Sequence, residues 1–423
     1  MNVLILGSGA REHTMAWKLS QSPQNPTLFV APGNAGTASL ATNLPLSVTD
    51  FGGIAQAVHQ NNIELVLVGP EDPLVLGISD YFAADPQLAN VPVIGPNKTA
   101  AQLEGSKQYA KEFLIRHGIP TAAYAAFTAD TLAEGQAFLT TLKAPYVLKA
   151  DGLAAGKGVL ILSDLAEAQS ALAEMLVDQK FGAASQTVVI EEFLSGIELS
   201  CFVLTDGHSY KVLPTAKDYK RIGEGDTGLN TGGMGAISPV PFADEAFMDK
   251  VHQRVVIPTV EGLKKDGITY VGFIFIGLIK VGDDPMVIEY NVRMGDPETE
   301  VVLPRIKTDL LTLLHATGQG TLHEVALEID TRTATTVMAV AGGYPEAYQK
   351  GHPITGIDQV KEALVFQAGT AQKGDQVCTN GGRVLAVTAF GADYRQALAE
   401  SYRGLSHISF QDMYFRKDLG FDL

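Results

Sequence analysis

Short apolar runs alternate with polar, helix-forming stretches along the first hundred residues. The runs at 3–6, 28–30, 65–68 and 91–94 are rich in Val, Leu and Ile, which is typical of buried strands. Residues 12–19, which lie between the first two runs, are expected to form a helix. Strands that alternate with helices predict a parallel, doubly wound sheet, and the ligands of such a sheet bind beyond the carboxyl ends of its strands.

Three glycine-containing turns follow these predicted strands, at residues 7–12, 32–36 and 69–73. The first is similar to a dinucleotide-binding loop, but Glu12 replaces the third glycine and no acidic residue ends the second strand. A glycine loop that opens a helix still binds anions through backbone N–H groups and the helix dipole. We therefore predict a cradle for a monophosphate here, with an ordinary tight turn as the alternative.

A second unit is predicted to begin near Leu103. Ser106 is expected to cap a helix that runs to Arg116, because apolar residues follow it at helical spacing and Gly118 and Pro120 stop it.

Further elements follow in two groups. Residues 124–192 show the order strand, helix, hairpin, helix, strand, and the last hundred residues show two strands and a helix near 394–405. The sequence therefore predicts an α/β protein of three units, at residues 1–103, 104–325 (with a flap at about 123–192) and 326–423.

One segment near residue 290 combines an apolar run with polar residues at every second position. The apolar residues before Glu289 predict the end of a buried strand. Side chains alternate along a strand, so Glu289, Asn291 and Arg293 are expected on one face. Carboxylate and amide oxygens suit Mg²⁺, which takes few protein ligands beside phosphate oxygens and water. An arginine just beyond them suits an anionic substrate, and the alternative is a solvated edge strand with an incidental ion pair.

A glycine-rich hairpin is predicted between residues 146 and 161. Its loop contains three glycines, among them Gly156, and glycines allow successive N–H groups to converge on a polyphosphate. Lys149, on the incoming strand, is placed to reach a phosphate as a point charge. The Walker pattern is absent because Gly158 follows Lys157, so we predict a flap rather than a P-loop, with a plain hairpin as the alternative.

The predicted strand near residue 190 ends in acidic residues. Free N–H and C=O groups at a strand end can bind the edge of an adenine. Glu198, seven residues after Glu191, is placed to accept hydrogen bonds from ribose hydroxyls. The alternative is a strand with solvated acids at its end.

Residues 217–238 are rich in glycine and polar side chains and are predicted to form one long loop. A loop of this length inside a compact domain is usually functional or disordered. Lys220 and Arg221 make it basic, and a mobile surface loop is the alternative interpretation.

The amino-acid composition limits the classes of molecule that are expected to bind this protein. The 423 residues include 31 basic and 47 acidic side chains, a net charge of −16, which argues against nucleic acid because a phosphate backbone needs a basic stripe. No apolar run approaches the length of a membrane span, and the N-terminus lacks the features of a signal peptide. The two cysteines, Cys201 and Cys378, cannot form a disulfide framework, so we expect a cytoplasmic protein.

Taken in order, these segments resemble an ATP-grasp enzyme. The shared features are Lys107 on a helix, Lys149 before the hairpin, the pattern E-E-x-L-x-G-x-E from Glu191 and the pattern E-x-N-x-R from Glu289. Other motifs resemble those of the phosphoribosylamine–glycine ligase (glycinamide ribonucleotide synthetase) family, and they begin at Ala10, Pro32, Gly69, Asn230, Asn291, Ala341, Thr379 and Phe415. The resemblance implies a central ATP-grasp unit of two α+β subdomains, between an N-terminal substrate-binding domain and a small C-terminal α/β domain.

The resemblance also implies a reaction and its residues. ATP, glycine and 5-phosphoribosylamine would give glycinamide ribonucleotide, ADP and phosphate through a glycyl phosphate, in de novo purine biosynthesis, with Mg²⁺ or Mn²⁺ as cofactor. No general base is evident. The implied residues are Glu289 and Asn291 for the metal; Lys107, Lys149, Gly156, Lys157, Glu191, Glu192, Leu194 and Glu198 for ATP; Gly9, Asn34, Glu71 and Gly233 for the other substrates; and Arg293, Asp218 and Asp296 for catalysis.

The expected partners are these small substrates, without nucleic acid or membrane, for a monomer or weak homodimer. Three other functions remain as alternatives: an ATP-grasp ligase that joins a different acid to an amine, an ATP-binding regulatory module without catalysis, and a nicotinamide oxidoreductase. Only the spacing of Gly7 and Gly9 favours the last of these.

Overall fold

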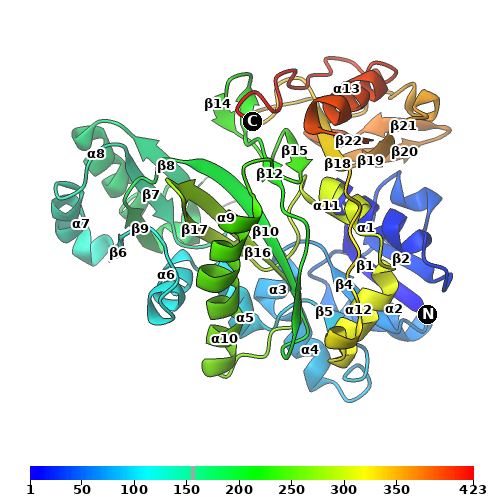
Figure 1. Cartoon of the computed structure of the whole chain (residues 1–423), viewed down its shortest axis with the longest axis horizontal. Coiled ribbons are helices and arrows are strands. Elements are labelled where there is room, and N and C mark those ends of the chain that lie inside the picture. Colours follow the sequence, from blue (N-terminus) through cyan, green and yellow to red (C-terminus); the bar gives the residue numbers. More distant parts are fainter. Residues whose placement is uncertain (154–157) are drawn as a thin grey trace.

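The computed structural model describes residues 1–153 and 158–423, and its outer regions surround a central sheet. Figure 1 shows the N-terminal elements in blue at the right, the flap at the left and the C-terminal elements in orange and red at the top. The predicted Gly156 and Lys157 lie outside the described residues. In the part of the chain that is described, no helix is both long and apolar enough to cross a membrane.

The N-terminal region contains the predicted parallel sheet, with strands in the order β3-β2-β1-β4-β5. Strands β1 and β4 are buried on both faces, which explains their continuous apolar runs. The elements are β1 (Asn2–Gly7), α1 (Ala10–Ser20), β2 (Thr27–Pro32), β3 (Thr42–Asn43), α2 (Phe51–Gln60), β4 (Leu65–Val68), α3 (Asp72–Leu76), α4 (Ile78–Ala84), β5 (Val93–Ile94) and α5 (Lys98–Gly105).

The flap is an antiparallel sheet, in the order β6-β9-β7-β8, that packs against α7 and α8. It has the predicted order of strand, helix, hairpin, helix and strand. The helix before it, α6, begins as predicted, because the Ser106 hydroxyl accepts a hydrogen bond from the Tyr109 N–H at 3.1 Å. The elements are α6 (Lys107–Arg116), β6 (Tyr124–Thr128), α7 (Leu132–Leu139), β7 (Tyr146–Ala150), β8 (Val159–Leu162), α8 (Leu165–Leu176) and β9 (Thr187–Glu191).

A second antiparallel sheet, in the order β11-β10-β16-β17, lies at the centre of the molecule. The strand predicted before Glu289 is its edge strand β17. The elements are β10 (Ile197–Thr205), β11 (Tyr210–Val212), α9 (Glu245–Val251), α10 (Ile257–Lys265), β16 (Gly272–Val281), β17 (Asp284–Asn291), α11 (Thr299–Arg305) and α12 (Leu310–Gln319), and a π-helical segment, His252–Val256, joins α9 to α10.

The C-terminal sheet corrects one prediction, because residues 217–238 are not one loop. Strands β12 and β15 of this segment extend the sheet, whose order is β12-β15-β18-β22-β19, and β13 and β14 form a hairpin between them. The partner of β15, β18, lies about a hundred residues further along the chain, so no local pattern revealed this pairing. The elements are β12 (Lys217–Asp218), β13 (Arg221–Gly223), β14 (Thr227–Asn230), β15 (Gly235–Ser238), β18 (Thr333–Val340), β19 (Leu364–Gln367), β20 (Thr370–Lys373), β21 (Gln376–Thr379), β22 (Arg383–Gly391) and α13 (Tyr394–Leu405).

Candidate active site

The edge strand β17 presents the two expected metal ligands next to each other on one face. Tyr290, between them, points the other way into the core, where its hydroxyl lies 2.6 Å from that of Thr259. Gly277 on β16 lies opposite Glu289, and a Cβ there would lie 3.2 Å from the Glu289 Cγ. Glycine at this position therefore leaves room for the Glu289 side chain, with Asn291 one step further along the same face.

Arg293 lies just beyond this strand and is held from several sides. Its Nη2 donates to Glu104 Oε1 at 2.7 Å and to Asn291 Oδ1 at 3.0 Å, and its Nε donates to Glu71 Oε2 at 3.2 Å. Glu104 is held in turn, because its Oε2 accepts from the Val292 N–H at 2.8 Å. The guanidinium of Arg293 is therefore fixed between the N-terminal region and β17, the strand with the two expected metal ligands, which we call the metal strand.

The two carboxylates around Arg293 ionise differently. Burial raises the pKa of Glu104 to about 7, and Arg293 only partly opposes this shift. Burial also acts to raise the pKa of Glu71, but the Arg293 and Arg11 guanidinium groups outweigh it and hold the pKa below its ordinary value. Glu104 is therefore the carboxylate of this group whose charge is least stable near neutral pH.

Lys107 joins α6 to the base of the flap. Its Nζ donates to the Ala150 and Gly152 carbonyls, each at 2.9 Å. Burial lowers its pKa, and Glu289 is the strongest of the charges that oppose this shift. Lys107 therefore lies within electrostatic reach of the expected metal ligand.

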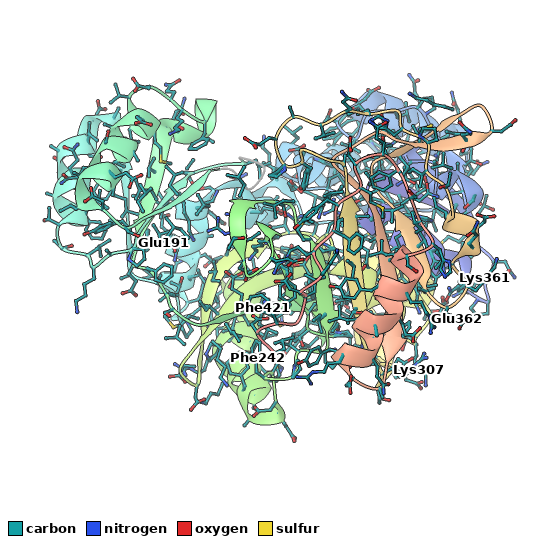
Figure 2. All side chains as sticks on the ribbon, turned by 90° about the horizontal axis from the view of Figure 1, so that it is seen from above. Glu191, Phe242, Lys307, Lys361, Glu362 and Phe421 are labelled. Atoms are coloured by element: carbon teal, nitrogen blue, oxygen red, sulfur yellow. The ribbon has the colours of Figure 1, made fainter. Side chains whose placement is uncertain are left out.

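Lys149 and Glu191 meet in a buried group that contains a second lysine. Lys149 Nζ donates to Glu191 Oε2 at 3.0 Å, and Lys111 Nζ lies 3.1 Å from the same oxygen. Figure 2 labels Glu191 in the lobe that the flap forms. Burial lowers the pKa of Lys111 to about 8, although Glu191 opposes the shift. Glu191, which was predicted to hold adenine or ribose, thus has one oxygen engaged with two ammonium groups.

The connection after β9 carries the remaining nucleotide candidates. Glu192 is exposed and accepts from the Ala123 N–H at 2.9 Å, and Leu194 is partly buried. Glu198, on β10, forms an ion pair with Lys220, and Lys220 Nζ also lies 3.8 Å from Asp218. Lys220 is therefore an exposed residue of the short connection between β12 and β13, and it is paired with acidic groups of the site.

Asp296 and Gly233 meet where the central and C-terminal regions join. Arg383 Nη2 lies 3.0 Å from Asp296 Oδ1, and Arg383 Nη1 donates to the Asp296 carbonyl at 2.8 Å. Gly233 has φ +116°, and a Cβ there would lie 2.4 Å from Pro297 Cδ. Glycine is needed at this position for both its conformation and its space.

The first N-terminal turn differs from the predicted phosphate cradle. The Gly9 N–H, an expected donor, already donates to Glu12 Oε2 at 2.6 Å, and Arg11 Nε pairs with Glu12 Oε1 at 2.6 Å. A Cβ on Gly69 would overlap this carboxylate, so Glu12 fills the space between the turns. The Glu12 carboxylate, whose charge Arg11 compensates, therefore takes the N–H group that a phosphate at this turn would need. Gly9 also lies beside Asp296.

Asn34, which was expected to bind substrate, is instead fully engaged within the protein. Its side-chain oxygen accepts from the Gly36 and Thr37 N–H groups at 2.8 and 3.0 Å, and its Nδ2 donates to the Gln367 carbonyl at 2.7 Å and the Ser8 carbonyl at 2.9 Å. Asn34 is buried. Its side chain therefore positions the turn against the C-terminal region, and this geometry does not support direct contact with a ligand.

The structure thus brings most predicted residues into one region. Glu289 is near both Lys107 and Lys220, and Lys149 influences Lys107 and Glu198 through its charge. Arg293 connects this group through Asn291 to Glu71. The predicted residues that do not contribute as expected are Asn34, whose side chain is engaged elsewhere, and Gly9, whose N–H is occupied.

Three charged residues of this region were not assigned a role from the sequence: Glu104, Lys111 and Arg383. Lys111 follows Lys107 by four residues, so both lie on one face of α6. That spacing was an available signal. Glu104 and Arg383 gave no local signal, because their partners Arg293 and Asp296 lie far away in the sequence.

The residues on β17 fit a divalent cation that also binds a nucleotide. The described residues contain no group of three or more His, Cys, Asp or Glu side chains suited to hold a metal. Asn291 Oδ1 accepts one hydrogen bond and keeps a second lone pair, while its buried Nδ2 has no hydrogen-bond partner among the described residues. One carboxylate and one amide oxygen, completed by phosphate and water, is the pattern typical of Mg²⁺.

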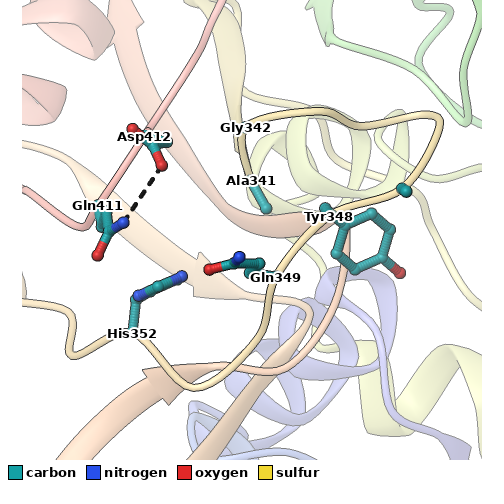
Figure 3. A pocket seen from close by; sticks show the side chains of 8 residues that line it. Ala341, Gly342, Tyr348, Gln349, His352, Gln411 and Asp412 are labelled. Atoms are coloured by element: carbon teal, nitrogen blue, oxygen red, sulfur yellow. Dashed lines mark hydrogen bonds between the residues drawn. The ribbon is translucent and has the colours of Figure 1, made fainter.

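A separate pocket lies in the C-terminal region (Figure 3). It has a volume of about 410 Å³ and is lined by Gly342, Tyr348, His352 and Asp412, among others. None of its lining residues belongs to the predicted site.

A flap that carries Lys149, a helix that joins Lys107 to the base of this flap, and an edge strand that carries Glu289 and Asn291 are together the arrangement of an ATP-grasp enzyme. Solved structures agree on this fold: the biotin carboxylase domain of a 2-oxoglutarate carboxylase from Hydrogenobacter thermophilus, in complex with MgADP, matches with a TM-score of 0.72 at 16% identity, over 98% of this chain and 91% of that chain.

The chain belongs to the phosphoribosylglycinamide synthetase family. The N domain of that family matches residues 1–104, its ATP-grasp (A) domain residues 105–299 and its C domain residues 334–422. Among curated relatives, the phosphoribosylamine–glycine ligase of Allochromatium vinosum is 48% identical over 99% of this chain and 98% of that protein, and that of Vibrio cholerae is 46% identical over 100% and 98%. The crystal structure of the phosphoribosylamine–glycine ligase of Thermotoga maritima matches with a TM-score of 0.86 at 35% identity, over 99% of this chain and all of that chain. The predicted family and fold class are therefore confirmed.

Proposed function

We propose that this chain is an ATP-dependent ligase that joins glycine to 5-phosphoribosylamine and yields glycinamide ribonucleotide, ADP and phosphate in purine biosynthesis. The observation that supports this most is the full-length similarity to phosphoribosylamine–glycine ligases, because it covers the flap, the metal strand and the N-terminal turns together. Of the alternatives, an oxidoreductase has no support, since Glu12 fills the glycine turn on which that interpretation rested.

The reaction needs an activated carboxylate, because a carboxylate itself is a poor electrophile. Transfer of the γ-phosphoryl group to glycine would give a glycyl phosphate with a good leaving group, which the ribosyl amine then attacks. Arg293 would stabilise negative charge on the carboxylate or its phosphate, and the contacts that hold its guanidinium, from Glu104 and Asn291, support this role. Asp218 and Asp296 are proposed to orient glycine and the amine.

The nucleotide is proposed to bind between the flap and the central sheet. Lys107 and Lys149 would contact its phosphates, and the chain from Glu192 to Leu194, with Glu198, would hold adenine and ribose. Glu289 and Asn291 would hold Mg²⁺ or Mn²⁺, which neutralises phosphate charge when bound. Gly156 and Lys157 are also proposed to contact ATP, on the basis of the sequence alone. Water hydrolyses an acyl phosphate readily, so we expect the flap to cover the site during the reaction.

The phosphoribosyl group is proposed to bind beside the third N-terminal turn, which carries Glu71, with Gly233 near the reacting amine, because the Gly9 N–H and the Asn34 side chain are engaged within the protein. We also propose the division into units at 1–103, 104–325 and 326–423, a cytoplasmic setting, and a monomer or weak homodimer. The burial of both cysteines, Cys201 and Cys378, is compatible with a reducing compartment.

An ADP-release assay with freshly generated phosphoribosylamine tests the function. ADP should form only when glycine, phosphoribosylamine, ATP and a divalent cation are all present, and each omission should abolish it. Turnover with another amino acid and none with glycine would favour a different carboxylate–amine ligase. MgATP binding without product from any acid would favour a regulatory module.

A further inference from the structure

A continuous chain of polar contacts joins the flap to the metal strand, with Lys111 at its centre. Lys111 Nζ donates to Thr121 Oγ1 at 2.7 Å, and Thr121 Oγ1 donates to the Val287 carbonyl of β17 at 2.7 Å. On its other side, Lys111 lies 3.1 Å from Glu191 Oε2, which also accepts from Lys149 at 3.0 Å. Val287 is two residues before Glu289, so these contacts connect Glu191 of the flap, through the segment after α6, to the strand that carries Glu289.

Along this series of polar contacts, buried positive groups outnumber buried negative groups. Lys111, Lys149 and Glu191 are all buried, with relative exposures of 2%, 6% and 4%, so two ammonium groups share one carboxylate. A buried carboxylate needs a single cation for compensation. One of the two lysines is therefore in excess for the stability of the pair.

The two lysines differ in what else they contact. Lys111 also donates to Thr121 and reaches the Ala122 carbonyl at 3.5 Å, which ties its ammonium group to the protein. Lys149 has Glu191 as its one hydrogen-bond partner among the described residues. Lys149 is thus the lysine that can turn to a phosphate, while Lys111 remains in place.

We propose that Lys111 is the counter-ion that stays with Glu191 when Lys149 leaves it to bind a nucleotide phosphate. Without Lys111, the departure of Lys149 would leave a buried carboxylate without compensation, which is strongly unfavourable, so Glu191 would retain Lys149 and the nucleotide would bind weakly. Lys111 is a positioning residue in this account, since it does not touch the nucleotide itself. The inference rests on the proposed binding of nucleotide phosphates by Lys149.

Titration of the full-length protein with MgADP tests this proposal. Lys111→Met should raise the Kd for MgADP at least about tenfold, while Lys111→Arg, which keeps the charge, should stay within about threefold of the unchanged protein. Lys143→Met removes an exposed lysine of the same flap and should leave the Kd unchanged. Thermal unfolding of each variant reports whether the fold is intact.

The decisive comparison uses Glu191→Gln as a background. A neutral side chain at position 191 needs no counter-ion, so adding Lys111→Met to Glu191→Gln should change the Kd less than about threefold. This comparison also holds if Lys111→Met alone does not fold, because the double variant buries no uncompensated carboxylate. If Lys111→Met weakens binding equally in both backgrounds, Lys111 acts through packing or direct contact and the counter-ion role is wrong.

The same titration separates the two proposals. If the unchanged protein binds MgADP and Lys111→Met binds it equally well, the counter-ion role fails and the proposed function stands. If the unchanged protein does not bind MgADP, the proposed function fails and the counter-ion role fails with it.

Discussion

The two ends of the candidate site arrange their charges in opposite ways. At the flap, two lysines converge on the single carboxylate of Glu191. Beyond the metal strand, two carboxylates, Glu71 and Glu104, converge on the single guanidinium of Arg293. Among the groups in direct ion pairs, ammonium groups outnumber carboxylates at the first end and carboxylates outnumber guanidinium groups at the second, where Arg11 also acts on Glu71 through its charge.

This difference bears on how each end receives an anion. A phosphate that arrives at the flap meets an ammonium group that the protein does not need for its own charge balance. An anion that arrives at Arg293 has to compete with carboxylates already in place, of which Glu71 is the more exposed. The flap end is therefore ready to bind an anion because it has an ammonium group to spare. The Arg293 end is ready because its guanidinium already has a fixed position before any substrate binds.

The largest expected effect lies between the two ends, at the metal ligand. Glu289→Gln keeps the size of the side chain but removes the charge that holds a divalent cation. We expect kcat to fall by about 1000-fold, or about 4 kcal/mol, since a metal supplies several kcal/mol to phosphoryl transfer. Steady-state ADP release over a range of Mg²⁺ and Mn²⁺ concentrations measures this. Near-normal turnover at ordinary metal concentration would remove Glu289 from the site.

Glu104→Gln tests the Arg293 end through the pH dependence of the free energy of unfolding. Its folded-state pKa of about 7 lies above the ordinary value of 4.5. Between pH 4.5 and 7 the folded protein therefore keeps a proton that the unfolded chain has lost, and the free energy of unfolding falls as pH rises, by about 3 kcal/mol for this group. Glu104→Gln has no carboxyl group at this position and so does not lose this stability as pH rises. The free energy of unfolding of the variant minus that of the unchanged protein should therefore increase by about 3 kcal/mol between pH 4.5 and 7.

Urea unfolding at several pH values measures this difference. Other buried groups titrate in the same range, such as His13, whose pKa burial lowers to about 4, but they are common to both proteins and cancel. A difference between the two proteins that does not change with pH would show that Glu104 has no raised pKa.

Lys149→Ala examines the flap end. Lys111 remains beside Glu191 in this variant, so the fold should keep its stability while the nucleotide loses one phosphate contact. We expect the Michaelis constant for ATP to rise about tenfold, which corresponds to about 1.4 kcal/mol. Lys143→Ala, on the exposed surface of the same flap, is the matched control. An unchanged constant and rate would place Lys149 outside the nucleotide site.

Local pattern predicted those parts of the molecule whose partners are near in sequence. The strand before Glu289, the cap at Ser106 and the hairpin after Lys149 were all predicted from alternation or turn residues, and the structure contains each of them, although the strand ends at Asn291 and Arg293 lies beyond it. The parallel N-terminal sheet followed from the same alternation, although α2 was not predicted.

Long-range pairing could not be predicted in the same way. Strand β14 is exposed along its length and β12 has two residues, so neither shows an apolar period, and β15 pairs with a strand far along the chain. Asn34 was predicted to bind substrate, but its side chain donates to the Gln367 carbonyl, 333 residues away. The sequence shows that a polar side chain stands in this turn, but it does not show whether that side chain binds a ligand or another part of the protein.

The smallest expected effect concerns how the flap is attached to the helix that carries Lys107 and Lys111. Ser106 caps α6 through the Tyr109 N–H and donates to both carboxylate oxygens of Asp151 at 3.1 Å. Asp151 also accepts from the Gln108 N–H at 3.0 Å. Ser106→Ala removes the cap and should lower the free energy of unfolding by about 1 kcal/mol.

Asp151 retains its contact with Gln108 in Ser106→Ala, so the flap should remain attached and the Michaelis constant for ATP should rise by less than about threefold. Chemical denaturation and ATP kinetics on the same preparation give both values. Ser106→Gly, which costs only a few tenths of a kcal/mol at a cap position, separates the loss of the cap from the loss of the Asp151 contact. If both variants raise the Michaelis constant strongly while Ser106→Gly keeps its stability, the contact with Asp151 controls the flap, and the lysines at the flap end depend on position as much as Arg293 does.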